Sequence, residues 1–412
     1  MAHAKPNIAK LKKRGDPEAD ALITKIQERA GDPRVVFQLM GAVARWMPGD
    51  PFGKLDEELV AFLQQPCQRP DWANSPLIKT AQANYKRDKN PTRVVLGVYS
   101  LPALYLDPDI ALALIGTGQL SLHVRPRLEH TQNFVDAVMM PGALDQPASG
   151  GPAPGWLWIR RVRLTHAIRR ALAKLQASSR NGKPDFLGAL VRDDPLAVLH
   201  AKGGFNSRDD EPIDQVELAY VMLTFSWAVA DGVSRLGPRY RMGRAAREAH
   251  IHTWAVIGHM LGIVDELLPG IEPRGADRHA KELFEMLRRQ HLDKGDPLPP
   301  PGGLPPIGVE EGRQLMAALM VVLVDVAREN IPESFRWLVE ASRWLDNVLQ
   351  DLPRVLLYKL AGTDTARMLH VTPAPLLHWL VCRIIIIVID LRAWDTQREK
   401  PAPSARADHS FE

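Results

Sequence analysis

Apolar residues recur at the spacing of an α-helix along most of this 412-residue chain. No stretch keeps the two-residue alternation of a half-buried strand, and no Asn-Gly turn separates two apolar runs. The pattern therefore predicts an all-α fold, with helices at 17–30, 34–46, 55–65, 76–87, 108–118, 127–140, 156–177, 214–236, 244–267, 277–291, 310–329, 333–350 and 376–394.

Glycine and proline interrupt this helical pattern at a few places. The strongest interruption lies within residues 296–306, where six of the eleven residues are proline. We take it as the main boundary of the chain. The predicted organisation is an N-terminal helical wrap at 1–90, a central core at 91–292, a linker at 293–306 and a C-terminal helical layer at 307–412.

The predicted helix at 156–177 has two apolar faces, which indicates burial on both sides. One stripe contains Leu157, Leu164, Ile168, Ala171 and Leu175; the other contains Ile159, Val162, His166 and Ala173. His166 thus points into an apolar space, and several arginines, among them Arg161 and Arg163, lie within about two turns of it. An imidazole over an apolar pocket, with guanidinium groups to hold carboxylates, is what a haem requires. The alternative is a hydrogen-bonded core histidine.

A second candidate face lies on the preceding predicted helix. Arg127, His130, Thr131 and Phe134 stand at helical spacing and share one side. This donor-rich patch, about 35 residues before His166, is suited to the opposite wall of a haem pocket. The alternative is an amphipathic helix whose polar residues lie at the solvent edge.

Four sequence blocks together resemble the family of latex-clearing proteins and the fungal mycophenolic-acid-pathway oxygenase. They are Arg-x-x-His-Thr at 127–131, Arg-Val-Arg-Leu-Thr-His-Ala-Ile-Arg at 161–169, Pro-Ile-Asp-Gln and the run that follows at 212–226, and His-Thr-Trp-Ala-Val-Ile-Gly-His-Met-Leu-Gly at 252–262. Each block is weak alone, and their order and spacing carry the resemblance. It implies a globin-like helical haem-binding core, with 91–292 as the oxygenase-like part.

The resemblance also implies residue roles. His166 is then the proximal ligand of a haem b, Arg127 and Thr131 lie on the distal side near the haem edge, and Arg163 joins the predicted cofactor-binding set. His130 replaces a distal lysine of the rubber-cleaving members, so it is either a sixth iron ligand or a hydrogen-bond donor to bound dioxygen. The family's distal glutamate has no counterpart here; Asp109 and Glu129 are the nearest acids.

The implied reaction is oxidative cleavage of a C=C bond, with O2 as co-substrate and a hydrophobic alkene such as a polyisoprene, a terpenoid or an aromatic alkene as substrate. Two other interpretations stay open. One is a haem-binding protein without oxygenase activity, such as a gas sensor or haem carrier. The other is a haem-free helical interaction protein, in which His166 is a core residue.

Composition narrows the setting. The formal charge is +4, from 52 basic and 48 acidic residues, and no basic cluster is interleaved with aromatics, so nucleic-acid binding is not expected. The apolar run at 375–391 is shorter than the ~20 residues of a bilayer span and contains Arg383. It predicts a buried helix, with weak membrane-surface contact as the alternative. The charged first 30 residues predict a cytoplasmic protein, or a secreted one whose leader was removed. Oligomeric state is left open.

The remaining histidines favour structural roles. His250, His252 and His259 lack the adjacent-turn spacing of a helical metal site and are expected to pack or to form hydrogen bonds. His200 is the second choice as haem ligand. Asp214 is predicted to cap the helix that follows it.

Overall fold

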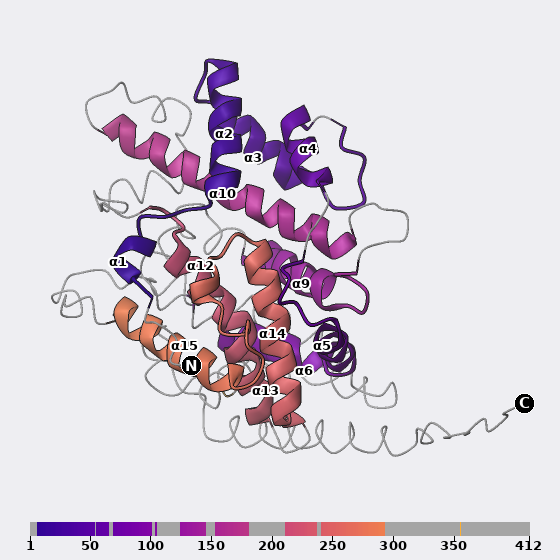
Figure 1. Cartoon of the computed structure of the whole chain (residues 1–412). Helices are drawn as coiled ribbons and strands as arrows, with labels where there is room; N and C mark the ends of the chain where they lie inside the picture. Colours follow the sequence, from indigo (N-terminus) through magenta and orange to yellow (C-terminus); the bar gives the residue numbers. More distant parts are fainter. Residues whose placement is uncertain are drawn as a thin grey trace, which may run out of the picture.

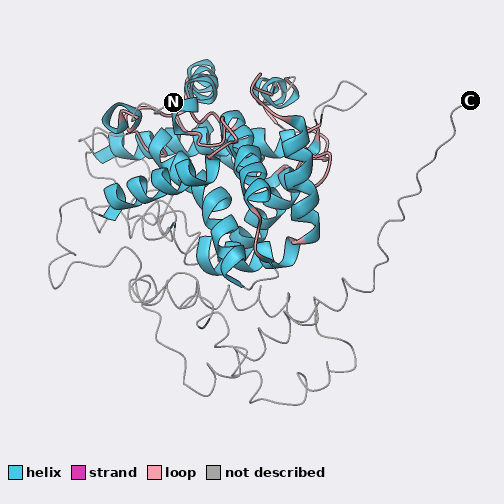
Figure 2. Cartoon of the chain, turned by 60° about the horizontal axis from the view of Figure 1, so that its bottom comes forward, coloured by secondary structure: helices cyan, strands magenta, loops and turns pink. Residues whose placement is uncertain are grey.

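The structure is a computed structural model that describes residues 6–53, 55–65, 69–100, 104, 124–145, 153–180, 211–236, 240–292 and 355. Within these residues all regular structure is helical, apart from one isolated bridge between Pro48 and Asp50. Figure 2 shows helices throughout this part of the chain. The predicted all-α fold is confirmed, whereas the globin-like arrangement stays a prediction.

The described helices follow one another as shown in Figure 1. The N-terminal ones are α1 (Ile8–Leu11), α2 (Pro17–Ala30), α3 (Val35–Arg45), α4 (Glu57–Gln64), α5 (Ser75–Arg87) and α6 (Lys89–Val95). The central and later ones are α9 (Val124–Met139), α10 (Pro154–Arg180), α12 (Gln215–Leu223), α13 (Val229–Leu236), α14 (Arg244–Met260) and α15 (Ala276–Leu292). Two π-helical turns, η1 (Leu96–Ser100) and η2 (Thr224–Ala228), and one short 3₁₀ helix, η4 (Asp265–Leu267), complete the set.

α10 divides the buried apolar residues into two clusters. The N-terminal cluster joins one face of α10 to α2, α3 and α4, through buried residues such as Ile23, Leu39 and Leu164. The main cluster joins the other face, through Ile159, to α5, α9 and the helices from α12 to α15. Figure 1 shows this arrangement, with α2, α3 and α4 on one side of the long α10 and α12, α14 and α15 on the other.

The local sequence explains several helix boundaries. Asp16 caps α2 by accepting from the backbone N–H of Ala19 at 3.3 Å, Pro17 is the first helical residue, and Gly31 ends the helix with φ +62°. α2 therefore has the predicted bounds, 17–30. Asp214 accepts from the N–H groups of Val216 and Glu217 at 2.7 and 2.8 Å, which confirms the predicted cap of α12.

Two predicted helices differ from the structure. The helix predicted at 244–267 ends at Met260, because Gly262 takes φ +84° and turns the chain away before η4. The helix predicted at 214–236 is interrupted by η2, a π-helical turn. A π-helical turn contains one more residue than an α-helical turn, and here all of its residues are buried in line with the apolar run. The helices predicted at 108–118, 310–329, 333–350 and 376–394, like the linker at 293–306 and nearly all of the layer at 307–412, lie outside the described residues. The domain boundaries stay predictions.

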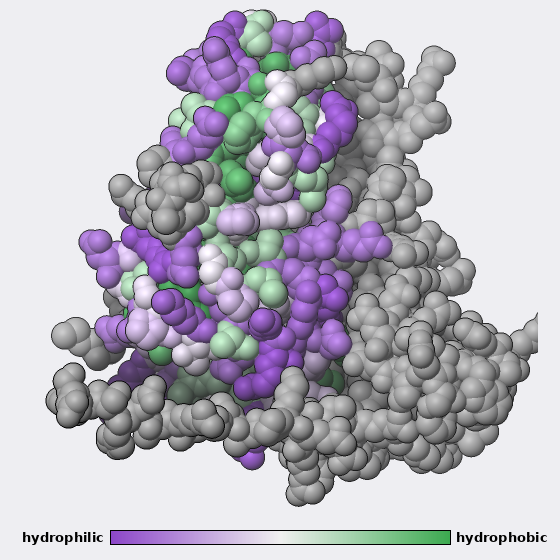
Figure 3. All heavy atoms as spheres, turned by 90° about the vertical axis from the view of Figure 1, so that its right-hand side faces the viewer, coloured by the Kyte–Doolittle hydropathy of each residue, from purple (hydrophilic) through white to green (hydrophobic). Residues whose placement is uncertain are grey.

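One described stretch, Gln215–Leu236, is long and apolar enough to cross a membrane by length and composition. Its most apolar window is 83% buried within the protein, as expected of a core helix. On the face drawn in Figure 3, apolar residues gather in the upper half, at the level of the N-terminal helices in Figure 1, and polar residues surround them. The apolar run at 375–391 lies outside the described residues.

Candidate functional site

α10 is held in place by arginines that bind the ends of neighbouring helices. Arg161 donates to the carbonyls of Val43, Ala44 and Trp46 at 3.2, 3.0 and 2.8 Å, where α3 ends. Arg160 donates to the carbonyl of Phe62, near the end of α4. Carbonyls in a last helical turn lack partners within their own helix, and a cation there is favourable. Arg161 is therefore a helix cap and not the free carboxylate holder that its place near His166 indicated.

His166 lies on the face of α10 that the sequence predicted. Ile159 and Val162, on the same face, pack in or against the main cluster, whereas Leu164 and Ile168 pack in the N-terminal cluster. Both predicted apolar faces are confirmed.

The imidazole of His166 is neutral and has no hydrogen-bond partner in the described structure. Burial, followed by the charges of Arg170 and Arg169, lowers its pKa to about 3. Its Nδ1 atom is buried without a partner, although the residue as a whole is partly exposed. A neutral imidazole whose nitrogens have no described hydrogen-bond partner is chemically fit to bind an iron centre.

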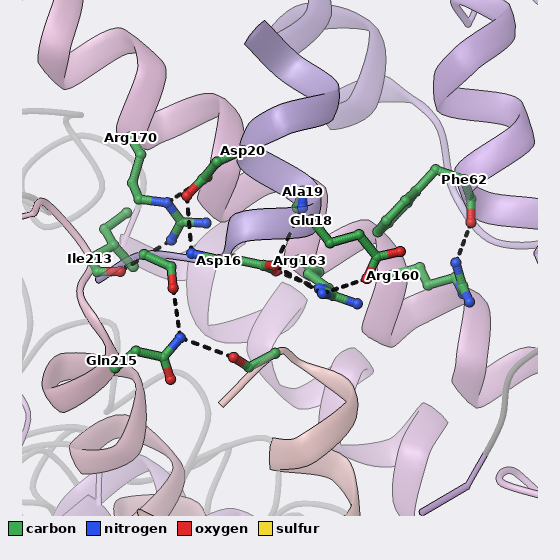
Figure 4. A network of polar contacts seen from close by, with 12 residues as sticks. Asp16, Glu18, Ala19, Asp20, Phe62, Arg160, Arg163, Arg170, Ile213 and Gln215 are labelled. Carbon is green, nitrogen blue, oxygen red and sulfur yellow. Dashed lines mark hydrogen bonds and ion pairs between the residues drawn. The ribbon is translucent and has the colours of Figure 1, made fainter. Parts of the chain in front are cut away.

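Arginines one turn before and one turn after His166 pair with the start of α2 (Figure 4). Arg163 binds Asp16, with one contact at 2.9 Å, and Glu18 at 2.8 Å. Arg170 binds Asp20 at 2.8 Å. These contacts give Arg163 a role in joining the N-terminal segment to α10, which the sequence did not predict. Its predicted role toward a cofactor stays a prediction.

A second polar junction lies beside this one, at Gln215. Its side-chain amide donates to the carbonyls of Gly15 and Gly262 at 2.7 and 2.9 Å, and its oxygen accepts from the N–H of Val264 at 2.9 Å. One side chain thus joins the N-terminal segment, the start of α12 and the turn after α14. Figure 4 shows it next to the arginine pairs.

The predicted distal residues lie on α9, which packs against α10. His130 is exposed, Thr131 is partly buried, and Phe134, one turn further on, is in the main cluster. The helix backbone includes Arg127, whose side chain lies outside the described structure. Arg127, His130 and Thr131 thus share a helix adjacent to that of His166, while their roles stay predictions.

An aromatic chain begins at Phe134 and leads to the π-helical turn η2. The ring centroids of Phe134 and Trp254 of α14 lie 6.4 Å apart. Trp254 stacks on Phe225 of η2 with a centroid distance of 5.2 Å. The Nε1 atom of Trp254 is buried without a hydrogen-bond partner. η2 is joined to η1 by a buried hydrogen bond of 2.6 Å from Ser100 to the carbonyl of Thr224. Paired π-helical turns are uncommon and often mark functional sites; the sequence pattern carried no sign of either.

The three histidines of α14 make structural contacts, as predicted. His252 accepts from the N–H of Asn74 at 2.8 Å and contacts the carbonyl of Gly270 at 2.6 Å. His250 contacts the carbonyl of Phe225 at 3.3 Å, and His259 contacts Asp265 at 2.6 Å. His200 and Asp109 lie outside the described residues, and Glu129 is exposed.

The residues described by the structure contain no group of three or more His, Cys, Asp or Glu side chains that could hold a metal ion among themselves. A haem iron needs only one or two protein ligands, because the porphyrin supplies the others. His166, with its orphaned nitrogen on an apolar face, fits that requirement.

Comparison with known proteins gives two matches. The model of a family described as "ER-bound oxygenase mpaB/B'/Rubber oxygenase, catalytic domain" matches residues 91–386, more than two thirds of the chain. A solved structure entitled "Structure of Latex Clearing Protein LCP in the closed state" is similar in fold, with a TM-score of 0.57 and 16% identity, over 96% of this chain and 87% of that one. No match was found among curated proteins.

Proposed function

The chain belongs to the mpaB/B′ and rubber oxygenase family and is an oxygenase of that family, and from this premise we propose that it is a haem b-dependent dioxygenase acting on a hydrophobic alkene. The proposed reaction cleaves a C=C bond of a polyisoprene, terpenoid or aromatic alkene to two carbonyl products and consumes O2. The observation that supports it best is the neutral imidazole of His166, whose buried Nδ1 has no partner, on a helix within the matched region.

His166 is the proposed axial ligand. Burial keeps its imidazole unprotonated at neutral pH, so a nitrogen lone pair is available for iron without a prior deprotonation step. The contacts of Arg160 and Arg161 with the ends of α4 and α3 fix the helix that carries it. Bound haem b would supply dioxygen activation, a chemistry that no amino-acid side chain provides.

The proposed distal side is the face of α9 that carries Arg127, His130 and Thr131. A guanidinium at Arg127 is suited to a propionate, and the hydroxyl of Thr131 can donate a hydrogen bond to the same group. The exposed imidazole of His130 can orient oxygen by hydrogen bonding or take a coordination position. We retain both roles for His130, since either is consistent with its place on α9.

The aromatic chain of Phe134, Trp254 and Phe225 is the proposed apolar wall of the reaction site. Aromatic side chains bind an apolar alkene through buried area and keep water away from activated oxygen. Phe134 lies one turn beyond His130 and Thr131 on the same helix, so this wall begins where the proposed distal face ends.

The first test is the absorption spectrum of the purified protein with a pyridine haemochrome assay. We expect one b-type haem per chain in the wild type, its loss in His166→Ala, and its retention in the control His259→Ala, which changes a partly exposed histidine on α14. His130→Ala then reports whether a six-coordinate spectrum becomes five-coordinate. Full haem retention in His166→Ala would refute the ligand assignment, and a haem protein that gives no carbonyl product from any alkene would be a sensor or carrier. The cytoplasmic location stays a prediction.

A further inference from the structure

We propose that Asp20 is a positioning residue, which acts through Arg170 to set the charge beside His166. The inference rests on the proposed function of His166 as axial ligand. It assigns to the N-terminal segment, before the region matched by the family model, a part in controlling the proposed haem site.

Arg170 is a helical neighbour of His166 and is held by two contacts. It follows His166 by four residues on α10, so the two side chains are neighbours on one helical face. The guanidinium is 1% exposed, binds Asp20 through Nε at 2.8 Å and donates from a terminal nitrogen to the carbonyl of Ile213 at 3.1 Å. Its remaining terminal nitrogen is buried without a partner. The position of this charge is therefore fixed from two sides (Figure 4).

Asp20 is held as firmly as its partner. It lies in the first turn of α2, and its second carboxylate oxygen accepts from the N–H of Asp16 at 3.0 Å. Burial raises the pKa of Asp20, and the charge of Arg170 opposes that rise. The carboxylate is 25% exposed, so the pair lies at the edge of the buried region.

The backbone at Ile213, whose carbonyl Arg170 binds, is a second observation that points to a function at this junction. Ile213 has φ +53°, a conformation that β-branched residues rarely adopt. Arg170 holds its carbonyl, and the cap residue Asp214 follows directly. Local backbone strain of this kind is usually kept where the geometry serves a function.

Two of the arginine charges near His166 are balanced by one segment. On this face of α10, Arg163 stands one turn before the histidine and Arg170 one turn after it, and both pair with acids at the start of α2. A full charge in a poorly hydrated environment acts strongly on a nearby redox centre and its ligand. Removing the charge of Asp20 leaves Arg170 unbalanced, and a positive charge favours the reduced, less positive state of the iron.

The test compares the midpoint potential of the haem in the wild type with that of Asp20→Asn, Arg170→Gln and Asp20→Glu. We expect Asp20→Asn to raise the potential, with a shift on the order of tenfold in the redox equilibrium, or about 59 mV for one electron. Arg170→Gln should lower it, and Asp20→Glu should restore it toward the wild-type value. Opposite shifts are the signature of charge, since general damage to the fold would move both variants the same way.

Glu58→Gln is the matched control. Glu58 also binds α2, through Lys25 at 3.0 Å and Arg29 at 2.8 Å, but it lies on α4 and does not contact α10 arginines. We expect the haem midpoint potential of Glu58→Gln to equal that of the wild type. An unmoved potential in Asp20→Asn, or a shift as large in Glu58→Gln, would overturn the inference. If Arg170→Gln does not fold, the Asp20 variants alone decide.

The two proposals fail in different ways. A wild-type protein without haem would refute the proposed function and this inference with it. A normal haem spectrum that is lost in His166→Ala, combined with a midpoint potential that is the same in Asp20→Asn as in the wild type, would refute only the role of Asp20.

Discussion

Gln215 offers the sharpest test of how the N-terminal segment is attached. Its side chain is completely buried and makes three hydrogen bonds, to Gly15, Gly262 and Val264, of 2.7 to 2.9 Å. Gln215→Met keeps nearly the same volume and removes all three. The change leaves two carbonyls and one N–H buried without these partners.

The expected loss follows from these contacts. Each hydrogen bond contributes roughly 1 kcal/mol net, so the variant should lose about 3 kcal/mol of unfolding free energy. For a chain of this size that corresponds to a fall in the thermal midpoint of about 3 to 4 °C. Thermal unfolding followed by circular dichroism at 222 nm, with urea unfolding alongside, measures both quantities.

The control is Gln27→Met on α2. Gln27 is partly exposed, and none of the described hydrogen bonds uses its side chain, so its variant should stay within about 0.5 kcal/mol of the wild type. If Gln215→Met is as stable as Gln27→Met, the three contacts do not hold the segment and the reasoning is wrong.

Three further perturbations test the fold around the site. Asp214→Ala removes the cap of α12 and should cost about 1 kcal/mol, measured by urea unfolding; no change would contradict the capping role. Gly270→Ala places a Cβ 2.6 Å from the carbonyl of Ile251, which is backbone, so we expect a loss of at least about 2 kcal/mol, and a wild-type melting curve would disprove the close contact. Burial, and then Arg247, lower the pKa of His250 to about 4, against the opposing effect of its hydrogen bond to Phe225. Because the folded pKa lies below the unfolded value near ~6.5, the contribution of His250 to the unfolding free energy is fully present above pH ~6.5. It declines toward pH 4 by up to about 3 kcal/mol. His250→Gln should flatten that decline in thermal unfolding curves measured across this pH range.

Much of the helical framework is predictable from local signals. The periodicity of α10 predicted both of its buried faces, because residues on one helical face recur with a fixed spacing whatever they pack against. Asp16 and Gly31 bound α2 through side-chain and backbone preferences that act within one turn. The prediction failed after Met260, because the apolar residues on either side of Gly262 continue the pattern across the turn.

The candidate site was less accessible to such reasoning. The sequence placed arginines near His166 but could not show that Arg163 and Arg170 pair with acids about 150 positions earlier, since periodicity reports a face and not its partner. η2 could not be found either, because one added residue per turn leaves a uniformly apolar run unchanged. What the sequence did identify was the histidine itself, from its place on a face that carries otherwise apolar residues.

The two-sided packing of α10 also bears on how this protein can be divided. The family pattern starts at residue 91, yet Leu164 and Ile168, well inside it, are covered by helices that precede it. In a fragment cut at that boundary, one apolar face of α10 would be exposed to water. Such an exposed apolar face favours self-association. The region that matches the family is thus smaller than the region that must fold together. A truncated version of this protein should therefore retain residues 1–90.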